Sequence, residues 1–326
     1  MPHGKKEKMN SKNKIEIVII GSGAVGSVYG GMLSLLPETN VSILCRSDYD
    51  TVKQNGIKIE SIWKNFIFNP CQVIKNLQEY EGIPDYIIVT LKVLPEINLT
   101  KILNSIHKSS VIVLLQNGIG IEKKAKEEFP ENDLLSCLAF TCINRISSGY
   151  VKHYDYGTLN LGAYGELKNN KSLFLLNDLF SKAGVPCSVS DDILSARWKK
   201  LVWNAPFNPI SVLGGGIDTE QILKHPETLL LTEQVMKEVI SISKADGHSV
   251  PDETVQRMID MTLNMNPYKT SMLLDYEAGR PMEVEAILGN SVRIAKEYNL
   301  KVPHMETMYA LLKIMNDNNS KRKMKA

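Results

Sequence analysis

The sequence has few cysteines, and none of them form a close pair. Five cysteines occur among its 326 residues, and no Cys-x-x-Cys spacing is found. We therefore expect reduced thiols and no disulfide framework. Cys137 and Cys142 lie closest together, but no histidine or acidic residue clusters beside them. Core packing is their favoured role, and no metal site is expected.

Long hydrophobic runs are also lacking. The longest ones, such as Ile17–Ile20 and Ile87–Val89, are far shorter than the roughly 20 residues that cross a bilayer. The segment Met1–Lys14 is polar and basic and lacks the apolar core of a signal peptide. The sequence thus predicts no membrane helix and no membrane partner, and it indicates a cytoplasmic protein.

Neither sign of charge dominates the chain. Lysine and arginine number 38 and the acidic residues 36, which leaves a formal net charge of +2. Part of the basic excess lies in Lys5–Lys8 and Lys321–Lys325, which we interpret as solvated tails. A nucleic-acid-binding protein needs a dense basic face that displaces counterions from phosphates. No nucleic-acid partner is therefore expected.

Strands alternate with helices in the first part of the sequence. Lys14–Ile20 is a β-branched run that predicts a buried strand, Ala24–Leu36 is helix-like, and Val41–Leu44 supplies a second strand. Further strands are expected at Ile87–Thr90, Val111–Leu115 and Pro186–Val189, hairpins or edge strands at Gly56–Phe68 and Gly149–Gly162, and helices at Ile97–Ile106, Ile121–Phe129 and Lys171–Ala183. This alternation predicts an α/β, Rossmann-type doubly wound parallel sheet.

The pattern becomes wholly helical beyond about Asp191. Helical apolar spacing occurs at Ile193–Ala205, Leu230–Ala245, Glu253–Met265, Met282–Glu297 and Glu306–Asn316. At roughly 150 residues per domain, the length suits two domains. We expect a disordered leader over residues 1–13, a nucleotide-binding domain over 14–190, an all-α substrate and catalytic domain over 191–318, and a basic tail over 319–326.

A glycine-rich turn follows the first predicted strand. Gly21-Ser22-Gly23-Ala24-Val25-Gly26 matches G-x-G-x-x-G and opens a predicted helix. In such a turn Gly21 permits the tight bend, Gly23 lets the backbone approach a pyrophosphate, and Gly26 lets the helix pack on the strand. The free amides and the helix dipole favour phosphate. The six residues therefore predict a dinucleotide site.

The end of the second strand indicates which dinucleotide is preferred. NAD-binding folds place an acid about 20 residues after the turn, and here Arg46 stands 46 − 26 = 20 residues after Gly26. An arginine can hold a 2′-phosphate but cannot accept bonds from ribose hydroxyls, so NADP(H) is favoured. Two alternatives stay open: Asp48 is close enough to serve NAD, and Arg46 could be an ordinary surface charge.

Polar residues also follow two later strands. Lys92 comes after Ile87–Thr90, and Asn117 comes after Val111–Leu115 in a turn eased by Gly118. Ligands of doubly wound folds bind at these carboxyl ends. Lys92 and Asn117 are thus candidate contacts to cofactor or substrate, and solvated loop residues are the alternative.

Two polar residues interrupt an apolar helix in the second part. Lys200 and Asn204 are four residues apart and share a helix face. Desolvation disfavours a charged lysine, which makes it a better proton donor near neutral pH. A solvent-facing pair of Lys199 and Lys200 is the alternative. Pro206 should end or kink this helix, which leaves Asn208 without a predicted place.

Together these segments resemble the ketopantoate reductase (2-dehydropantoate 2-reductase) family over roughly Lys14–Leu312. The segments that carry the resemblance are the glycine turn, Lys92, Asn117-Gly118, Arg197–Pro209, and Ser271-Met272-Leu273 with Met282-Glu283-Val284-Glu285. The resemblance implies a catalytic Lys200, an active-site Glu283, pocket amides at Asn204 and Asn208, a carboxylate-binding Ser271, an NADP-phosphate contact at Arg46, and cofactor or substrate contacts at Lys92 and Asn117. From the residues alone, Ser271 carries no signal, and Glu283 behind Pro281 would be an ordinary acid in the first turn of a helix.

The resemblance implies NADPH-dependent reduction of ketopantoate to pantoate, a step of pantothenate and coenzyme A biosynthesis. Hydride would reach C2 of the substrate, and Lys200 would donate the proton. Trp203, Pro206 and Gly214–Gly216 differ from the best-studied members, so a different 2-oxo acid is an alternative. Two further alternative functions are a non-catalytic NADP(H) sensor and a 3-hydroxyacid or polyol-phosphate dehydrogenase. Assembly into a homodimer is also left open by the sequence.

Overall fold

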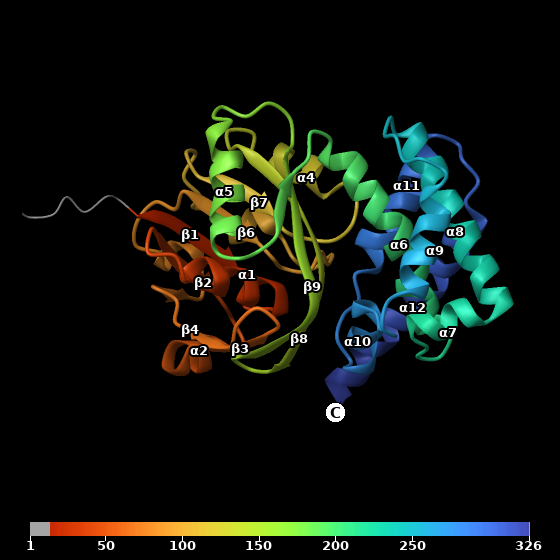
Figure 1. Ribbon diagram of the computed structural model, residues 1–326, viewed down its shortest axis with the longest axis horizontal. Coiled ribbons are helices and arrows are strands. Elements are labelled where there is room, and N and C mark those ends of the chain that lie inside the picture. Colours follow the sequence, from red (N-terminus) through yellow and green to blue (C-terminus); the bar gives the residue numbers. More distant parts are fainter. Residues whose placement is uncertain (1–13, 326) are drawn as a thin grey trace, which may run out of the picture.

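The computed structural model describes residues 14–325, and their side chains as far as residue 319. The expected leader, residues 1–13, and the last residue of the expected tail lie outside the described residues. Figure 1 shows an α/β part, coloured red to green, beside a helical part coloured green to blue. The predicted fold class is confirmed: a mostly parallel sheet is followed by an all-helical region, α6 to α12.

Ten strands of residues 14–325 form one sheet, in the order β4-β3-β9-β8-β7-β6-β1-β2-β5, with β10 paired to β9. The run from β8 to β5 is parallel at every pairing, whereas β8 with β9 and β3 with β4 are antiparallel. The strands are β1 Ile15–Ile20, β2 Thr39–Leu44, β3 Ile57–Ser61, β4 Phe66–Phe68, β5 Val73–Ile74, β6 Tyr86–Val89, β7 Val111–Leu114, β8 Leu134–Ser147, β9 Tyr150–Ala163 and β10 Cys187–Val189.

Both faces of this sheet are covered by helices. Alternate residues of β1 lie in different cores: Ile17 and Ile19 in one, Val18 and Ile20 in the other. This alternation is what a strand buried on both faces requires. The helices of this part are α1 Ala24–Ser34, α2 Tyr49–Asn55, η1 Leu77–Glu79, α3 Leu99–Ile102, α4 Ile121–Glu128 and α5 Lys171–Lys182.

The helical part has its own core, and α6 runs through it. Trp198 and Phe207 of α6 are among the largest fully buried side chains. The helices are α6 Ile193–Leu213, α7 Thr219–Lys224, α8 Pro226–Ala245, α9 Thr254–Leu263, α10 Ser271–Glu277, the π-helical turn η2 Glu285–Gly289, α11 Asn290–Glu297 and α12 Pro303–Lys325. Within residues 14–325, no helix is long and apolar enough to span a membrane.

Pro206 is expected to end or kink its helix, and the structure contradicts the first of these two outcomes. The helix α6 continues through Pro206 and Pro209 to Leu213. Each proline lacks an N–H and so removes one intrahelical hydrogen bond. The residues that follow, including Phe207 and Ile210, are buried in the core of the helical part, and this burial offsets the lost bonds. The helix expected over Ile97–Ile106 is shorter in the structure, where it consists of α3, Leu99–Ile102.

Candidate active site

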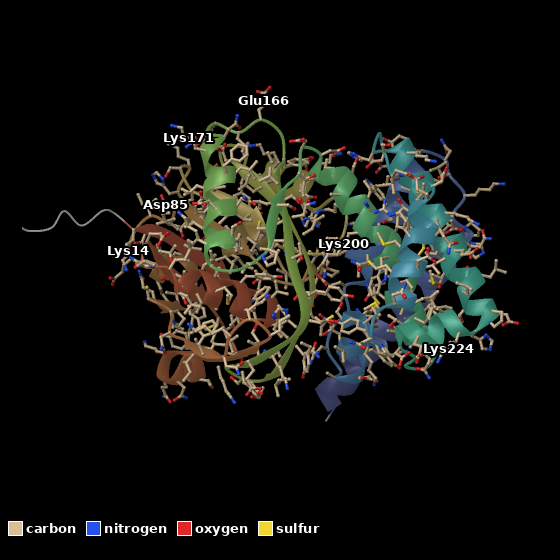
Figure 2. The ribbon with its side chains drawn as sticks, in the orientation of Figure 1. Lys14, Asp85, Glu166, Lys171, Lys200 and Lys224 are labelled. Atoms are coloured by element: carbon tan, nitrogen blue, oxygen red, sulfur yellow. The ribbon has the colours of Figure 1, made fainter. Side chains whose placement is uncertain are left out.

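A lysine, an amide and a carboxylate form a continuous chain of hydrogen bonds where the two parts of the protein meet. The Lys200 ammonium donates to Asn117 Oδ1 at 3.0 Å and to the carbonyl oxygen of Ala139 at 2.7 Å. The Asn117 amide donates to Glu283 Oε2 at 3.3 Å. Figure 2 shows Lys200 on α6, between the sheet and the other helices. The structure thus brings together three of the residues that the sequence singled out.

Parallel strands place the partners of the carboxylate. Asn117 follows β7, and Val93, which donates its backbone N–H to Glu283 Oε1 at 2.9 Å, follows the neighbouring strand β6. The carboxyl ends of adjacent parallel strands share one edge of the sheet, so both donors reach the same carboxylate. The helix expected over Met282–Glu297 begins only at Val284. Glu283 thus stands directly before the helix, and its carboxylate binds the amides of Val93 and Asn117 in the α/β part instead of free amides of its own helix.

Burial shifts both titratable groups of this chain. It lowers the pKa of Lys200 from 10.5 to about 8, with the nearby positive charge of Arg197 as the second cause, while Glu283 opposes the change. Burial raises the pKa of Glu283, against the stabilising bonds from Val93 and Asn117. A lysine of this pKa is mostly protonated at neutral pH and gives up its proton readily.

The neighbouring lysine does not share this environment. Both lysines are partly exposed, but Lys199 has no hydrogen bond or ion pair among the residues whose side chains are described, whereas the Lys200 ammonium is bound by Asn117 and Ala139. Adjacent residues of a helix are about 100° apart, so the two ammonium groups point in different directions. The interpretation of Lys199 and Lys200 as a solvent-facing pair therefore does not hold for Lys200.

Because α6 is continuous, Lys200, Asn204 and Asn208 lie at four-residue intervals on one stripe of the helix. Asn204 is 9% exposed, and its amide has no hydrogen-bond partner among the described side chains and backbone. Asn208 Oδ1 faces the backbone N–H of Met272, at 3.5 Å, in the first turn of α10. This contact brings Asn208 next to Ser271, which is exposed. Within the part of the chain that the structure describes, no hydrogen bond joins Asn204, Asn208 or Ser271 to the Lys200 ammonium.

The glycine turn has the shape that a dinucleotide needs. Gly21 has φ of +113°, a value that side-chain-bearing residues rarely adopt. A Cβ on Gly26 would lie 2.3 Å from the Gly21 carbonyl oxygen and 2.4 Å from Thr90 Oγ1, whereas a Cβ on Gly23 would meet nothing within 4 Å. Gly26 is therefore needed for packing, and Gly23 leaves open space beside the first turn of α1. The N-cap Gly23 offers no side-chain acceptor, so this turn, with Ser22, Ala24 and Val25, could hold a pyrophosphate through its free amides.

The residues after β2 differ in their access to a ligand. Arg46 is exposed, and its guanidinium has no partner among the described residues. Asp48 is 2% exposed, and its carboxylate forms an ion pair with Arg145 of β8. A buried, paired carboxylate is poorly placed to bind ribose hydroxyls. This geometry favours a phosphate contact at Arg46.

Lys92 has partners that the sequence did not suggest. Its ammonium lies 2.6 Å from Asp275 Oδ2 on α10 and 3.3 Å from the Pro281 carbonyl oxygen. Asp275 also pairs with Arg280 through its other oxygen, at 2.9 Å. Lys92 thus joins the α/β part to the helical part, close to Glu283.

Sequence reasoning missed several groups at the site. The Ala139 carbonyl and the Val93 amide are backbone atoms, which carry no side-chain signal. Phe140, whose ring centroid is 5.4 Å from the Lys200 ammonium, and Asp275 come from elements whose contact is set only by the tertiary fold. Arg197 stood within the segment that carries the resemblance, but its contacts were not foreseen.

Two family models match the chain. Residues 17–166 match the model described as ketopantoate reductase PanE/ApbA, and residues 192–316 match the model of the C-terminal part of the same family. A 2-dehydropantoate 2-reductase of Nostoc sp. is 36% identical over 312 residues, which cover 94% of this chain and 97% of that protein.

Solved structures agree with this match. A 2-dehydropantoate 2-reductase of Methylococcus capsulatus has a TM-score of 0.86 and 40% identity, and the match covers 93% of this chain and 97% of that one. D-mandelate dehydrogenase, solved with NADH and anilino(oxo)acetate, has a TM-score of 0.83 at 21% identity over 94% of this chain and 99% of that one. The second likeness shows a shared fold.

Proposed function

The chain belongs to the ketopantoate reductase family, and from this premise we propose that it uses NADPH to reduce ketopantoate to pantoate, for pantothenate and coenzyme A biosynthesis. The observation that carries the proposal is the chain of hydrogen bonds from Lys200 through Asn117 to Glu283. When bound, the nicotinamide cofactor supplies the hydride that reduces C2 of the substrate. The protein supplies positions, charges and one proton.

Lys200 is the proton donor. Its pKa of about 8 keeps the ammonium charged at neutral pH. Because this pKa lies near the working pH, the proton can pass efficiently to the alkoxide that forms at C2. The bonds to Asn117 and Ala139 hold the ammonium in one direction. The remaining N–H of the ammonium is then directed to substrate.

The other site residues bind and orient. Glu283 accepts from Asn117 and Val93 and in our proposal also orients the hydroxyl of the product. Asn204 offers an amide without a protein partner among the described residues, Asn208 lies beside α10, and Ser271 offers an exposed hydroxyl for the substrate carboxylate. The glycine turn, Arg46 and Lys92 belong to the cofactor side. When a ligand binds, the Lys92 ammonium would contact it either in place of Asp275 or together with Asp275.

The preference for NADPH is supported by the residues after β2. Arg46 is exposed and has no partner among the described residues, which suits a 2′-phosphate. Asp48, the acid that could serve the ribose of NAD, is paired with Arg145.

A different 2-oxo acid is the second candidate, favoured by Phe140. This ring is 41% exposed and lies over the Lys200 ammonium. An aromatic wall beside the proton donor suits an apolar or aromatic substituent on the keto carbon. The fold shared with D-mandelate dehydrogenase makes phenylglyoxylate a natural comparison.

One assay tests the proposal. Purified protein is mixed with NADPH and, in turn, with ketopantoate, phenylglyoxylate, pyruvate and 2-oxoisovalerate, and oxidation is followed by the loss of nicotinamide absorbance. We expect the highest kcat/KM with ketopantoate. A higher value with phenylglyoxylate would select the second candidate. Cofactor binding without turnover of any 2-oxo acid would contradict both and indicate a sensor.

A further inference from the structure

Arg197 lies one helical turn before Lys200 and binds the backbone on both sides of Asn117. Its Nη1 donates to the carbonyl oxygen of Gln116 at 2.7 Å and to that of Gly118 at 3.1 Å. Its Nη2 donates to Ser136 Oγ at 2.7 Å. One planar guanidinium thus brackets the residue that joins the proton donor to the carboxylate.

The guanidinium is buried against a matching acid. Arg197 and Glu122 of α4 form an ion pair, and their side chains are only 2% and 1% exposed. Ser136 Oγ donates to the same carboxylate oxygen, Oε1, at 2.7 Å, while Glu122 Oε2 is buried without a hydrogen-bond partner among the described residues. Burying two charges costs several kcal/mol per ion unless geometry and further hydrogen bonds compensate. A pair of this kind is a poor stabiliser in itself, which points to a role in fixing the geometry of its neighbours.

The residue types of the segment that Arg197 holds do not fix its backbone by themselves. Gly118 has φ of +100°, and glycine allows many other conformations. On the far side, the Ile119 amide donates to the Ala286 carbonyl oxygen at 3.2 Å in the turn η2, and Asn290 donates to the Ile119 carbonyl oxygen at 2.7 Å. Residues 116–119 are therefore held between α6 and the segment that carries Glu283.

We propose that Arg197 is a positioning residue, which, paired with Glu122, holds the turn after β7 so that Asn117 stays between Lys200 and Glu283. The proposal rests on the proposed function only in that the Lys200 ammonium is taken as the proton donor. Arg197 itself contacts backbone and protein side chains, and it acts through Asn117.

The same placement gives Arg197 an electrostatic effect. The titratable and charged groups that face Lys200 are Arg197 on its own helix, Glu283 before η2 and Cys137 on β8. After burial, the charge of Arg197 is the largest cause that lowers the pKa of Lys200, and Glu283 acts in the opposite direction; burial raises the pKa of Cys137, so its thiol stays neutral while Lys200 titrates. The effect of the position of Arg197 and the effect of its charge can therefore be tested separately with two variants.

The first variant, Arg197→Lys, tests position. Lysine keeps a cation beside Glu122 but lacks the planar fork that reaches two carbonyls. We expect kcat to fall by roughly 10²-fold, the scale of a misplacement of about 1 Å, with KM for NADPH unchanged. Deuterium uptake by the peptide that contains residues 116–121 should accelerate. Wild-type kcat together with wild-type uptake would overturn the proposal.

The second variant, Arg197→Met with Glu122→Met, tests charge without leaving a buried ion unpaired. The pKa of Lys200, read from isotope-labelled lysine resonances and assigned by Lys200→Met, should rise above its wild-type value. The alkaline limb of the kcat profile should move in the same direction. An unchanged pKa would overturn the electrostatic part. If this double variant does not fold, Arg197→Gln with Glu122→Gln replaces it: both charges are again removed together, polar side chains stay in place, and the pKa of Lys200 should rise in the same way.

A matched control separates positioning from general destabilisation. Leu179 of α5 is buried in the core of the α/β part, and Leu179→Ala should lower Tm without moving the pKa of Lys200 or the uptake at 116–121. If Leu179→Ala changed the pKa of Lys200 and the uptake at 116–121 as much as the Arg197 variants do, Arg197 would be merely structural. If the wild-type protein reduces no 2-oxo acid, the proposed function fails, but the uptake and the titration still test the role of Arg197.

Discussion

The ammonium of Lys200 and the carboxylate of Glu283 are joined through a single side-chain amide, that of Asn117. The amide accepts from the cation with its oxygen and donates to the carboxylate with its nitrogen. The two charged groups are thereby kept at a set spacing without a direct ion pair. A direct ion pair would hold the Lys200 proton more tightly, because an adjacent carboxylate raises the pKa of a lysine.

Replacement of Lys200 by alanine should lower kcat by roughly 10²–10⁴-fold, the usual contribution of a general acid. Binding of NADPH, measured by titration of protein fluorescence, should persist. Lys199→Ala is the matched control and should change kcat little, because Lys199 has no hydrogen bond or ion pair among the described side chains. Near wild-type turnover by Lys200→Ala would refute the assignment of the proton donor.

The pH dependence of reduction should show one alkaline limb from Lys200. Its pKa is lowered to about 8, and the protonated form is the active one, so kcat should be full below that pKa and fall as the pH rises through it. The measurement is kcat at saturating substrate from pH 6 to about 10. A rate that increases through the same range would mean that Lys200 acts as a base.

Replacement of Arg46 by alanine should weaken NADPH binding by about 1.5–3 kcal/mol, as expected for one charge-assisted contact. NADH binding should stay nearly constant, since NADH has no 2′-phosphate. Lys182→Ala on α5, which removes an exposed cation, serves as the control for net charge. Equal losses for both cofactors would argue against a phosphate contact at Arg46.

Replacement of Gly118 by alanine should disturb the junction between the two parts. A Cβ there would lie 2.5 Å from the Ala286 carbonyl oxygen, which is backbone and cannot move aside cheaply. We expect a loss of stability of about 1–3 kcal/mol from strain alone, and a further loss from the clash. Gly120 also has positive φ, +75°, but a Cβ there meets nothing within 4 Å.

The comparison of Gly118→Ala with Gly120→Ala therefore isolates the contact with Ala286. Both variants carry the backbone penalty, so urea denaturation should show the larger loss at Gly118. An equal loss at the two positions would mean that the contact contributes nothing beyond backbone strain.

Much of the α/β fold could be predicted from local patterns. The β-branched run before Gly21 and the spacing of its glycines reflect steric needs that act within a few residues, and the structure contains both features. The helix through Pro206 could not be predicted, because its continuation depends on burial against helices far along the chain.

The candidate site was predictable only as a set of separate residues. Lys200 could be singled out from its apolar surroundings, but the partner groups at Ala139 and Val93 are main-chain atoms that any residue would supply. The pairing of Lys92 with Asp275 joins positions from the two parts of the fold. Such pairings arise from the docking of one part on the other, which no local pattern encodes.

The π-helical turn η2 has a consequence for recombining members of this family. Its Ala286 carbonyl receives the Ile119 amide of the α/β part, and its backbone fits against Gly118. A chimera that joined residues 14–190 of this chain to the helical region of a relative would inherit the glycine but could lose the matching widened turn. Crossovers placed between the two parts should therefore yield active hybrids only when both sides of this contact come from the same parent.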